Sequence, residues 1–231
     1  MTSCCHRLSD QARRQLERGS KFENLSLGEQ RPTQLIRQYG NLYMQVRVEA
    51  LDALDNLREM DDSDDLKSKL AFSVVVLSFR SVRSTIEQKK AALRHILGIP
   101  SIGSGGSSDP AVTDMLESIG YYMRKSTEKY DIRPNVQDVC SQLYSTLFDF
   151  PSLSTCHGLT AYIEECVKLA WALSNQIPAY CIEYDANAYN ANFHERFHNS
   201  NPYSDHVISY LWPALREGEK GPCVYKAIVI T

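Results

Sequence analysis

Apolar residues recur at helical spacing along two long stretches of the sequence, residues 33–60 and 63–97. The acidic run at residues 61–65 separates the stretches and supplies side chains that cap helix N-termini. Two helices of this length, joined by a few residues, are expected to pack as a long antiparallel hairpin. This pattern already places the chain among the mostly helical folds.

Three further helices are predicted, at residues 110–129, 134–150 and 159–175. Asp109 and Pro110 suit the cap and first turn of the first of these. The Gly- and Ser-rich segment 98–109 before it is expected to be a flexible loop. Residues 1–32 are polar and are predicted to be a mobile N-terminal segment, with a short helix near residues 9–18.

Only two strands are predicted, at residues 179–184 and about 223–230, with a short helix near residues 204–212 between them. A lone strand leaves its backbone groups unpaired, so we expect these two to pair with each other. Residues 33–231 then form a single domain, mostly α, with a small two-stranded β element near the C-terminus. Trp171 and Trp212 lie on apolar helical faces beside this element, and we expect both to be buried in the core.

Composition excludes several classes of protein. The net charge is -3, so no global basic field attracts nucleic acid. No apolar run approaches the roughly 18 residues of a membrane span, and residues 1–19 lack an apolar signal core. The odd count of seven cysteines favours reduced thiols and a cytoplasmic location.

Residues His194, Glu195 and His198 match the H-E-x-x-H pattern of zinc hydrolases, and His206 is a candidate third ligand. The flanking sequence has little helical amphipathicity, and no glycine follows in the place that the extended metalloprotease motif needs. We therefore interpret the match as incidental and predict no metal, no cofactor and no catalytic residue. A zinc hydrolase remains the enzymatic alternative.

Two other patterns are weaker still. The Gly-rich stretch 103–108 lacks the Gly-Lys-Ser/Thr ending that cradles phosphate. Cys156 and His157 are adjacent in sequence, which does not establish the geometry of a nucleophile and its base.

Basic residues gather in two places, near the end of the second long helix and near the end of the third. Arg83, Lys90 and Arg94 fall near one helical face, at spacings of seven and four. Such residues can be a solvated face, or they can dock an anionic partner such as phospholipid headgroups. The predicted lipid-binding residues are Arg80, Arg83, Lys89, Lys90, Arg94, Arg124 and Lys125.

Several segments resemble the C-terminal domain of the mitochondria-eating protein family. The helix LTAYIEECVKLAWAL at 159–173 and the segment SYLWPAL at 209–215 are the most distinctive. The segments 38–58, 189–200 and 224–231 also contribute, and the resemblance covers roughly residues 33–231.

This resemblance implies a non-enzymatic protein of mitochondrial quality control and mitophagy. It implies a cytoplasmic or outer-membrane location and binding of cardiolipin, an anionic phospholipid, by peripheral contact. Long members of the family carry a coiled coil ahead of this domain. The residues before Thr33 are too few for one, so we expect an excised domain or a short member, and self-association stays open. The non-enzymatic alternative is a protein-interaction scaffold without lipid affinity.

Overall fold

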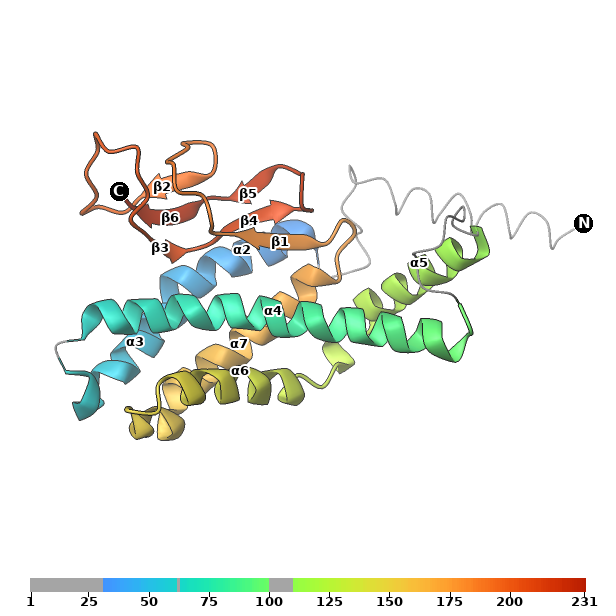
Figure 1. The fold of residues 1–231 in the computed structure, drawn as a ribbon, viewed down its shortest axis with the longest axis horizontal. Helices are drawn as coiled ribbons and strands as arrows, with labels where there is room; N and C mark the ends of the chain where they lie inside the picture. Colours follow the sequence, from blue (N-terminus) through green and yellow to red (C-terminus); the bar gives the residue numbers. More distant parts are fainter. Residues whose placement is uncertain (1–30, 62, 100–109) are drawn as a thin grey trace, which may run out of the picture.

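The computed structural model describes residues 31–61, 63–99 and 110–231. The predictions for the N-terminal helix near residues 9–18, most of the segment 1–32, the Gly-rich loop and the Asp109 cap lie outside the described residues. Within them, helices form one layer and short strands cover one side of it (Figure 1). The helices are α2 (Pro32–Asn41), α3 (Arg47–Asp55), α4 (Asp64–Ile96), α5 (Pro110–Lys125), α6 (Arg133–Thr146) and α7 (His157–Ser174).

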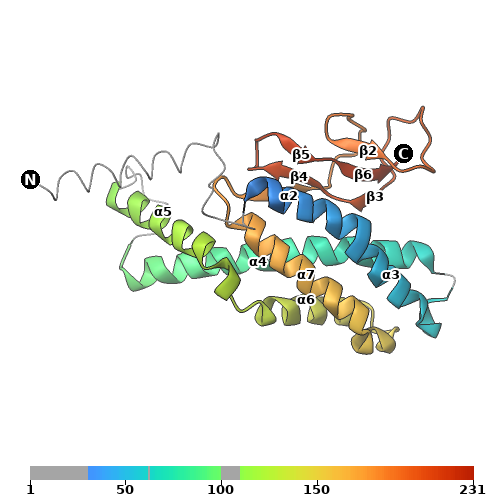
Figure 2. The same ribbon diagram turned by 180° about the vertical axis from the view of Figure 1, so that it is seen from behind.

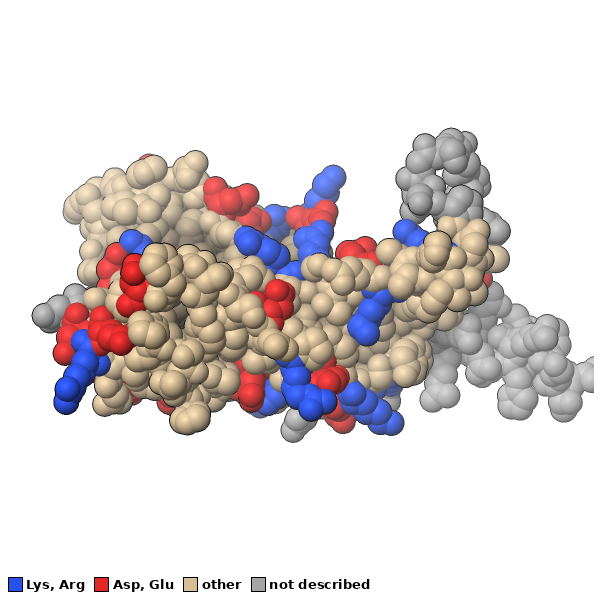
Figure 3. All heavy atoms as spheres, turned by 60° about the horizontal axis from the view of Figure 1, so that its bottom comes forward, with Lys and Arg blue, Asp and Glu red and all other residues tan. Residues whose placement is uncertain are grey.

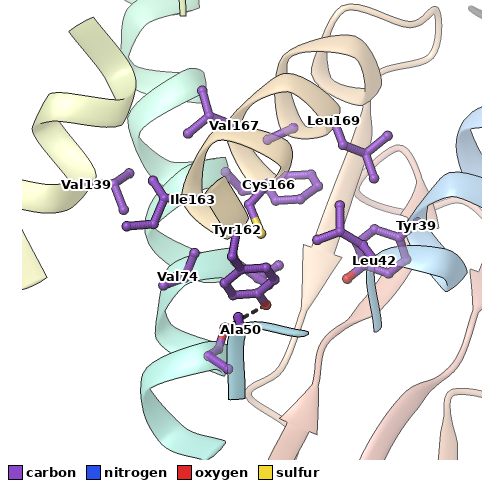
Figure 4. Packing of buried hydrophobic residues seen from close by; sticks show 14 of the residues in the cluster. Tyr39, Leu42, Ala50, Val74, Val139, Tyr162, Ile163, Cys166, Val167 and Leu169 are labelled. Carbon is purple, nitrogen blue, oxygen red and sulfur yellow. Dashed lines mark hydrogen bonds between the residues drawn. The ribbon is translucent and has the colours of Figure 1, made fainter. Parts of the chain in front are cut away.

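Helix α7 is the centre of the core. Ten of its 18 residues are buried, because its apolar side chains are not confined to one face. It contacts α4, α3, α2 and α6. The Tyr162 hydroxyl donates a hydrogen bond of 3.0 Å to the carbonyl oxygen of Ala71 on α4, among the buried side chains shown in Figure 4. The helices predicted at 110–129, 134–150 and 159–175 therefore correspond to α5, α6 and α7, with small shifts at their ends.

The predicted long helix hairpin is wrong. The first stretch is not one helix, because a π-helical turn at Leu42–Val46 separates α2 from α3, and a 3-10 turn follows at Arg58–Met60. The chief neighbour of both α3 and α4 is α7, not each other (Figures 1 and 2). Apolar periodicity identifies which face of a helix is buried, but not which partner covers it.

The close approach of α3 and α7 depends on Gly158. A Cβ atom at this position would lie 2.4 Å from the Cβ of Ala53, so only glycine lets the two helices come this near. Helix α7 therefore packs against α3, in the position that the hairpin prediction gives to the second long helix, α4.

The predicted two-stranded element is also wrong, since the described residues form two three-stranded sheets. The first sheet contains β1 (Tyr180–Glu183), β4 (Ala214–Glu217) and β5 (Cys223–Tyr225), in the order β1-β4-β5, all antiparallel. The second contains β2 (His194–Arg196), β6 (Ala227–Ile230) and β3 (Ser209–Trp212), in the order β2-β6-β3. In it β6 is central, parallel to β2 and antiparallel to β3.

Two local predictions about the strand region are also wrong. The segment 204–212 is not a helix, because Ser209–Trp212 is strand β3. The tail does not pair with residues 179–184, whose partner is β4. Strands of three or four residues are too short to show an alternating pattern, so their partners cannot be found from spacing.

The prediction that both tryptophans are buried is confirmed: Trp171 is 3% exposed and Trp212 is 0% exposed. The Trp171 ring stacks on Tyr130, with ring centroids 3.4 Å apart. Trp212 packs against Tyr39 and Tyr43 of the first helical segment. Trp171 therefore packs within the helical layer, whereas Trp212 joins strand β3 to that layer.

Candidate functional site

The H-E-x-x-H residues do not form a zinc site. The motif needs both histidines on one helical turn, but His194 and Glu195 belong to strand β2, and His198 lies beyond its end. Glu195, His198 and His206 are exposed. Within the described ranges, no group of three His, Cys, Asp or Glu side chains could hold a metal ion.

The contacts of His194 indicate a structural role. Its side chain is buried, and its Nδ1 accepts a hydrogen bond of 3.1 Å from the backbone N–H of Asn190. Its Nε2 lies 3.3 Å from the hydroxyl of Tyr210. Burial lowers the pKa of His194, and the carboxylate of Glu183 opposes this to a smaller degree. The imidazole therefore joins β2 to β3.

The contacts of Cys156 also indicate a structural role. Its thiol is buried and directed at the carbonyl oxygen of Ala53, 3.9 Å from Sγ, whereas the side chain of His157 is exposed. The five cysteines among the described residues are free thiols. Burial raises the pKa of Cys140, Cys166, Cys181 and Cys223, which makes each a weaker nucleophile at neutral pH.

Three of the predicted basic residues, Arg80, Arg83 and Lys90, line one cavity between α4 and β1. They follow one another along one stripe of α4, together with Glu87, at successive spacings of three, four and three. The cavity has a volume of about 360 Å³. Strand β1 forms its opposite wall, so these cations face the protein's own sheet and not only solvent.

The walls of this cavity, which we call the α4–β1 groove, are mainly apolar below the cations. The apolar lining residues come from both elements and are Val76, Phe79, Ile86, Ala179, Tyr180 and Ile182. A site with an apolar floor and a cationic rim suits a ligand that is itself amphipathic and anionic.

The rim carries three cations against two carboxylates. Arg83 Nη2 lies 2.8 Å from the carboxylate of Glu219, which is on the turn between β4 and β5. Lys90 Nζ lies 3.2 Å from the carboxylate of Glu87 on its own helix. The side chain of Arg80 makes no hydrogen bond or ion pair within the part of the chain that the structure describes. The groove therefore has one cation in excess.

The other predicted lipid-binding residues lie elsewhere. Lys89 points to another face of α4, with Nζ 5.5 Å from the centroid of the Tyr130 ring. Arg94 is half-buried on the last turns of α4, beyond the groove. On α5, Lys125 is exposed, whereas Arg124 is only 6% exposed and has its Cζ 5.6 Å from the ring centroid of Tyr121.

The seven basic residues therefore do not form one continuous patch. On the face shown in Figure 3, Lys and Arg side chains alternate with Asp and Glu, and wide uncharged areas separate them. Sequence spacing found the stripe on α4, but it could not find β1, the wall that turns the stripe into a groove. The apolar residues at 179–182 are the available signal in the sequence, but by themselves they indicate only a strand.

No helix of the described residues is both long and apolar enough to cross a membrane. Near the C-terminal end of α4, however, Ile96 and Leu97 are 76% and 55% exposed, close in sequence to Arg94. Apolar side chains next to cations are typical of surfaces that contact a bilayer without crossing it.

Comparison with known proteins adds an independent finding. A family model described as Mitochondria-eating protein matches residues 31–231. The chain is similar to the Mitochondria-eating protein of Macaca fascicularis, at 24% identity over 203 residues, and to that of Homo sapiens, at 25% identity over 203 residues. Each alignment covers 87% of this chain and 35% of the relative, so the chain spans about a third of the length of these curated relatives. No solved structure matches.

Proposed function

Because this chain belongs to the mitochondria-eating protein family, we propose that it is a non-enzymatic module of mitochondrial quality control and mitophagy. In this proposal it binds anionic phospholipid, cardiolipin in particular, by peripheral contact at mitochondrial membranes. It does so from the cytoplasm, at the outer membrane. The name of the family and of its relatives supports the mitochondrial part of the proposal.

The gathering of Arg80, Arg83 and Lys90 at the amphipathic α4–β1 groove is the observation that supports lipid binding. A cation close to an anionic membrane surface contributes about 1 kcal/mol, so several together hold a protein reversibly. Arginine suits this role because its planar guanidinium can bind two phosphate oxygens at once. Lys89, Arg94 and Lys125 lie outside the groove and would add separate contacts to an anionic surface, whereas the burial of Arg124 leaves it a minor role.

The test is removal of the groove cations in one triple variant, Arg80→Gln, Arg83→Gln and Lys90→Gln. Sedimentation with vesicles containing cardiolipin should fall on the order of 100-fold in affinity, since about 1 kcal/mol is lost at each position. A matched control is Lys69→Gln, Lys168→Gln and Lys226→Gln, which removes the same charge from exposed positions outside the groove. The control should bind nearly as the parent does.

Both triple variants are first checked for the parent's circular dichroism and melting temperature. Equal loss in the two variants would mean that net charge, and not the groove, governs binding. If the parent sediments no better with cardiolipin vesicles than with neutral vesicles, lipid binding is wrong. The protein-interaction scaffold would then be the better description.

A further inference from the structure

We propose that the α4–β1 groove is a site for one anionic lipid molecule, and that Glu219 occupies the place of the lipid phosphate in the free protein. The phosphate would bind Arg80 and Arg83, and one acyl chain would lie along the apolar floor. This inference rests on the proposed function, because it assigns anionic lipid binding to a defined pocket and adds a competing carboxylate from the chain itself.

The size and lining of the groove suit one acyl chain. Its volume of about 360 Å³ is at the lower end of the range for small-molecule pockets. Phe79, Ile86 and Tyr180 form the floor, and each is less than a tenth exposed. An acyl chain placed there would contact carbon on both the helix and the strand, while its headgroup remained at the rim among the cations.

The cations at the rim of the groove can bind a phosphate, which would replace any present partner. Arg80 makes no ion pair within the described residues, so a phosphate there would meet no internal competitor. Arg83 is paired with Glu219, but both side chains are mostly exposed, at 67% and 73%. Exposed pairs of this kind contribute little to stability, so a phosphate can replace the carboxylate at small cost.

The turn that carries Glu219 is fixed to the wall of the groove. Gly218 has φ +78°, a conformation that favours glycine. Its N–H donates a hydrogen bond of 2.9 Å to the carbonyl oxygen of Ala179, and its own carbonyl oxygen accepts one of 3.2 Å from the thiol of Cys181. Both partners line the groove. These two hydrogen bonds fix the turn, so its next residue, Glu219, stays at the rim.

The first experiment measures binding of lysophosphatidylglycerol, kept below its micelle-forming concentration, to the parent and to Glu219→Gln. Removing the competing carboxylate should strengthen binding by about two- to five-fold, the range that corresponds to a surface ion pair. The matched control is Glu195→Gln, which removes a charge that is also exposed, on β2 outside the groove, and should bind as the parent does. Equal affinity of Glu219→Gln and the parent would overturn the role of Glu219.

The second experiment uses Cys181 as a built-in reporter. Cys181 is half-buried and lines the groove, whereas Cys140 on α6 is also half-buried but lies outside it. Lysophosphatidylglycerol should slow maleimide labelling of Cys181 but not of Cys140, when each site is quantified by peptide mass spectrometry. Equal rates with and without lipid would overturn the assignment of the pocket. Equal protection by inorganic phosphate alone would overturn the acyl-chain part.

A third variant separates this inference from the proposed function. Ile182→Trp fills the groove from β1 and should abolish protection of Cys181 and binding of lysophosphatidylglycerol, while the rim cations still support sedimentation with cardiolipin vesicles. If the parent binds these vesicles but never the single-chain lipid, the pocket is wrong and surface binding stands. If the parent binds neither, the proposed lipid function fails as well.

Discussion

The hydroxyl of Tyr39 donates a hydrogen bond of 2.9 Å to the carbonyl oxygen of Pro213, 174 residues further along the chain. Tyr39 is 1% exposed, and its ring contacts Trp212 and Tyr225. Burial is the main reason why its pKa is raised well above the ordinary value, so the hydroxyl stays protonated and donates. This bond fixes α2 to the corner between β3 and β4.

Tyr39→Phe should lower the free energy of unfolding by about 1–3 kcal/mol, because it leaves a buried carbonyl oxygen without a donor. The measurement is chemical denaturation followed by circular dichroism. Tyr203→Phe removes the same hydroxyl from a side chain that is 94% exposed and is the matched control. A stability loss no larger than the control's would contradict the structural importance of this bond.

Gly158→Ala should destabilise the protein by about 1–3 kcal/mol, the usual cost of overpacking, because the new Cβ would meet Ala53 at 2.4 Å. Gly120→Ala is the comparison within another helix, since a Cβ there meets nothing within 4 Å. It should be neutral or stabilising by up to about 1 kcal/mol, since alanine favours helix. The melting temperature should therefore fall for Gly158→Ala and should not fall for Gly120→Ala. An equal fall in both variants would contradict the packing of α3 on α7.

Loss of strand β6 should be severe, because β6 is the central strand of its sheet. Deleting residues 224–231 removes the buried side chains of Ile228 and Val229, whose burial alone stabilises by about 3–6 kcal/mol. The truncated protein should melt at a lower temperature and aggregate, since β2 and β3 would lose their shared partner and expose the backbone groups that pair with it. An unchanged melting temperature would contradict this.

A milder change tests the same strand in a protein that still folds. Val229→Ala should cost about 1–3 kcal/mol, because Val229 is 0% exposed. Val48→Ala shortens a side chain that is 43% exposed and should cost less than about 0.5 kcal/mol.

Stability should depend on pH through His194. Burial lowers its pKa in the folded protein below the ordinary value of 6.5, so at mildly acidic pH the unfolded chain binds more protons than the folded one. The stabilisation linked to the protonation of His194 is therefore fully present above pH 6.5. It is lost as the pH falls from there through the lower pKa of the folded state. The free energy of unfolding should therefore fall less steeply in His194→Asn than in the parent when denaturation is measured at decreasing pH between 7.5 and 5.5. His198→Asn, an exposed control, should show the parent's dependence on pH.

Binding to cardiolipin vesicles should weaken as sodium chloride is raised. The Debye length is about 8 Å at physiological ionic strength and about 3 Å at 1 M, so the pull of headgroups on Arg80, Arg83 and Lys90 is screened. Sedimentation at 50, 150 and 500 mM salt measures the effect. Affinity that is constant across this range would contradict an electrostatic contact and favour insertion of apolar side chains.

Helical segments could be predicted from the sequence because the information for them is local. The stretch 63–97 is α4, and 159–175 is α7 within two residues at either end. The arrangement of these helices could not be predicted, because Gly158 and the apolar faces of α7 select partners through contacts between distant segments. The π-helical turn at Leu42–Val46 leaves no mark in apolar spacing.

The strands are harder to predict from the sequence than the helices, because they too depend on contacts between distant segments. Strand β2 consists of His194, Glu195 and Arg196, which are polar, and only its pairing with β6 makes it a strand. The same applies to the site: the stripe of Arg80, Arg83 and Lys90 is local, whereas the wall at residues 179–182 is not. Burial of Arg124 likewise depends on tertiary packing.

The central place of β6 affects how the chain folds during synthesis. Strands β2 and β3 leave the ribosome before β6 does, so their shared partner in the sheet is missing until β6 has emerged. At roughly 5–20 residues per second this interval is short, but it leaves two strand edges and the apolar surface around Trp212 without cover. Chaperone dependence during expression should therefore be concentrated in the interval before β6 emerges rather than in formation of the helical core.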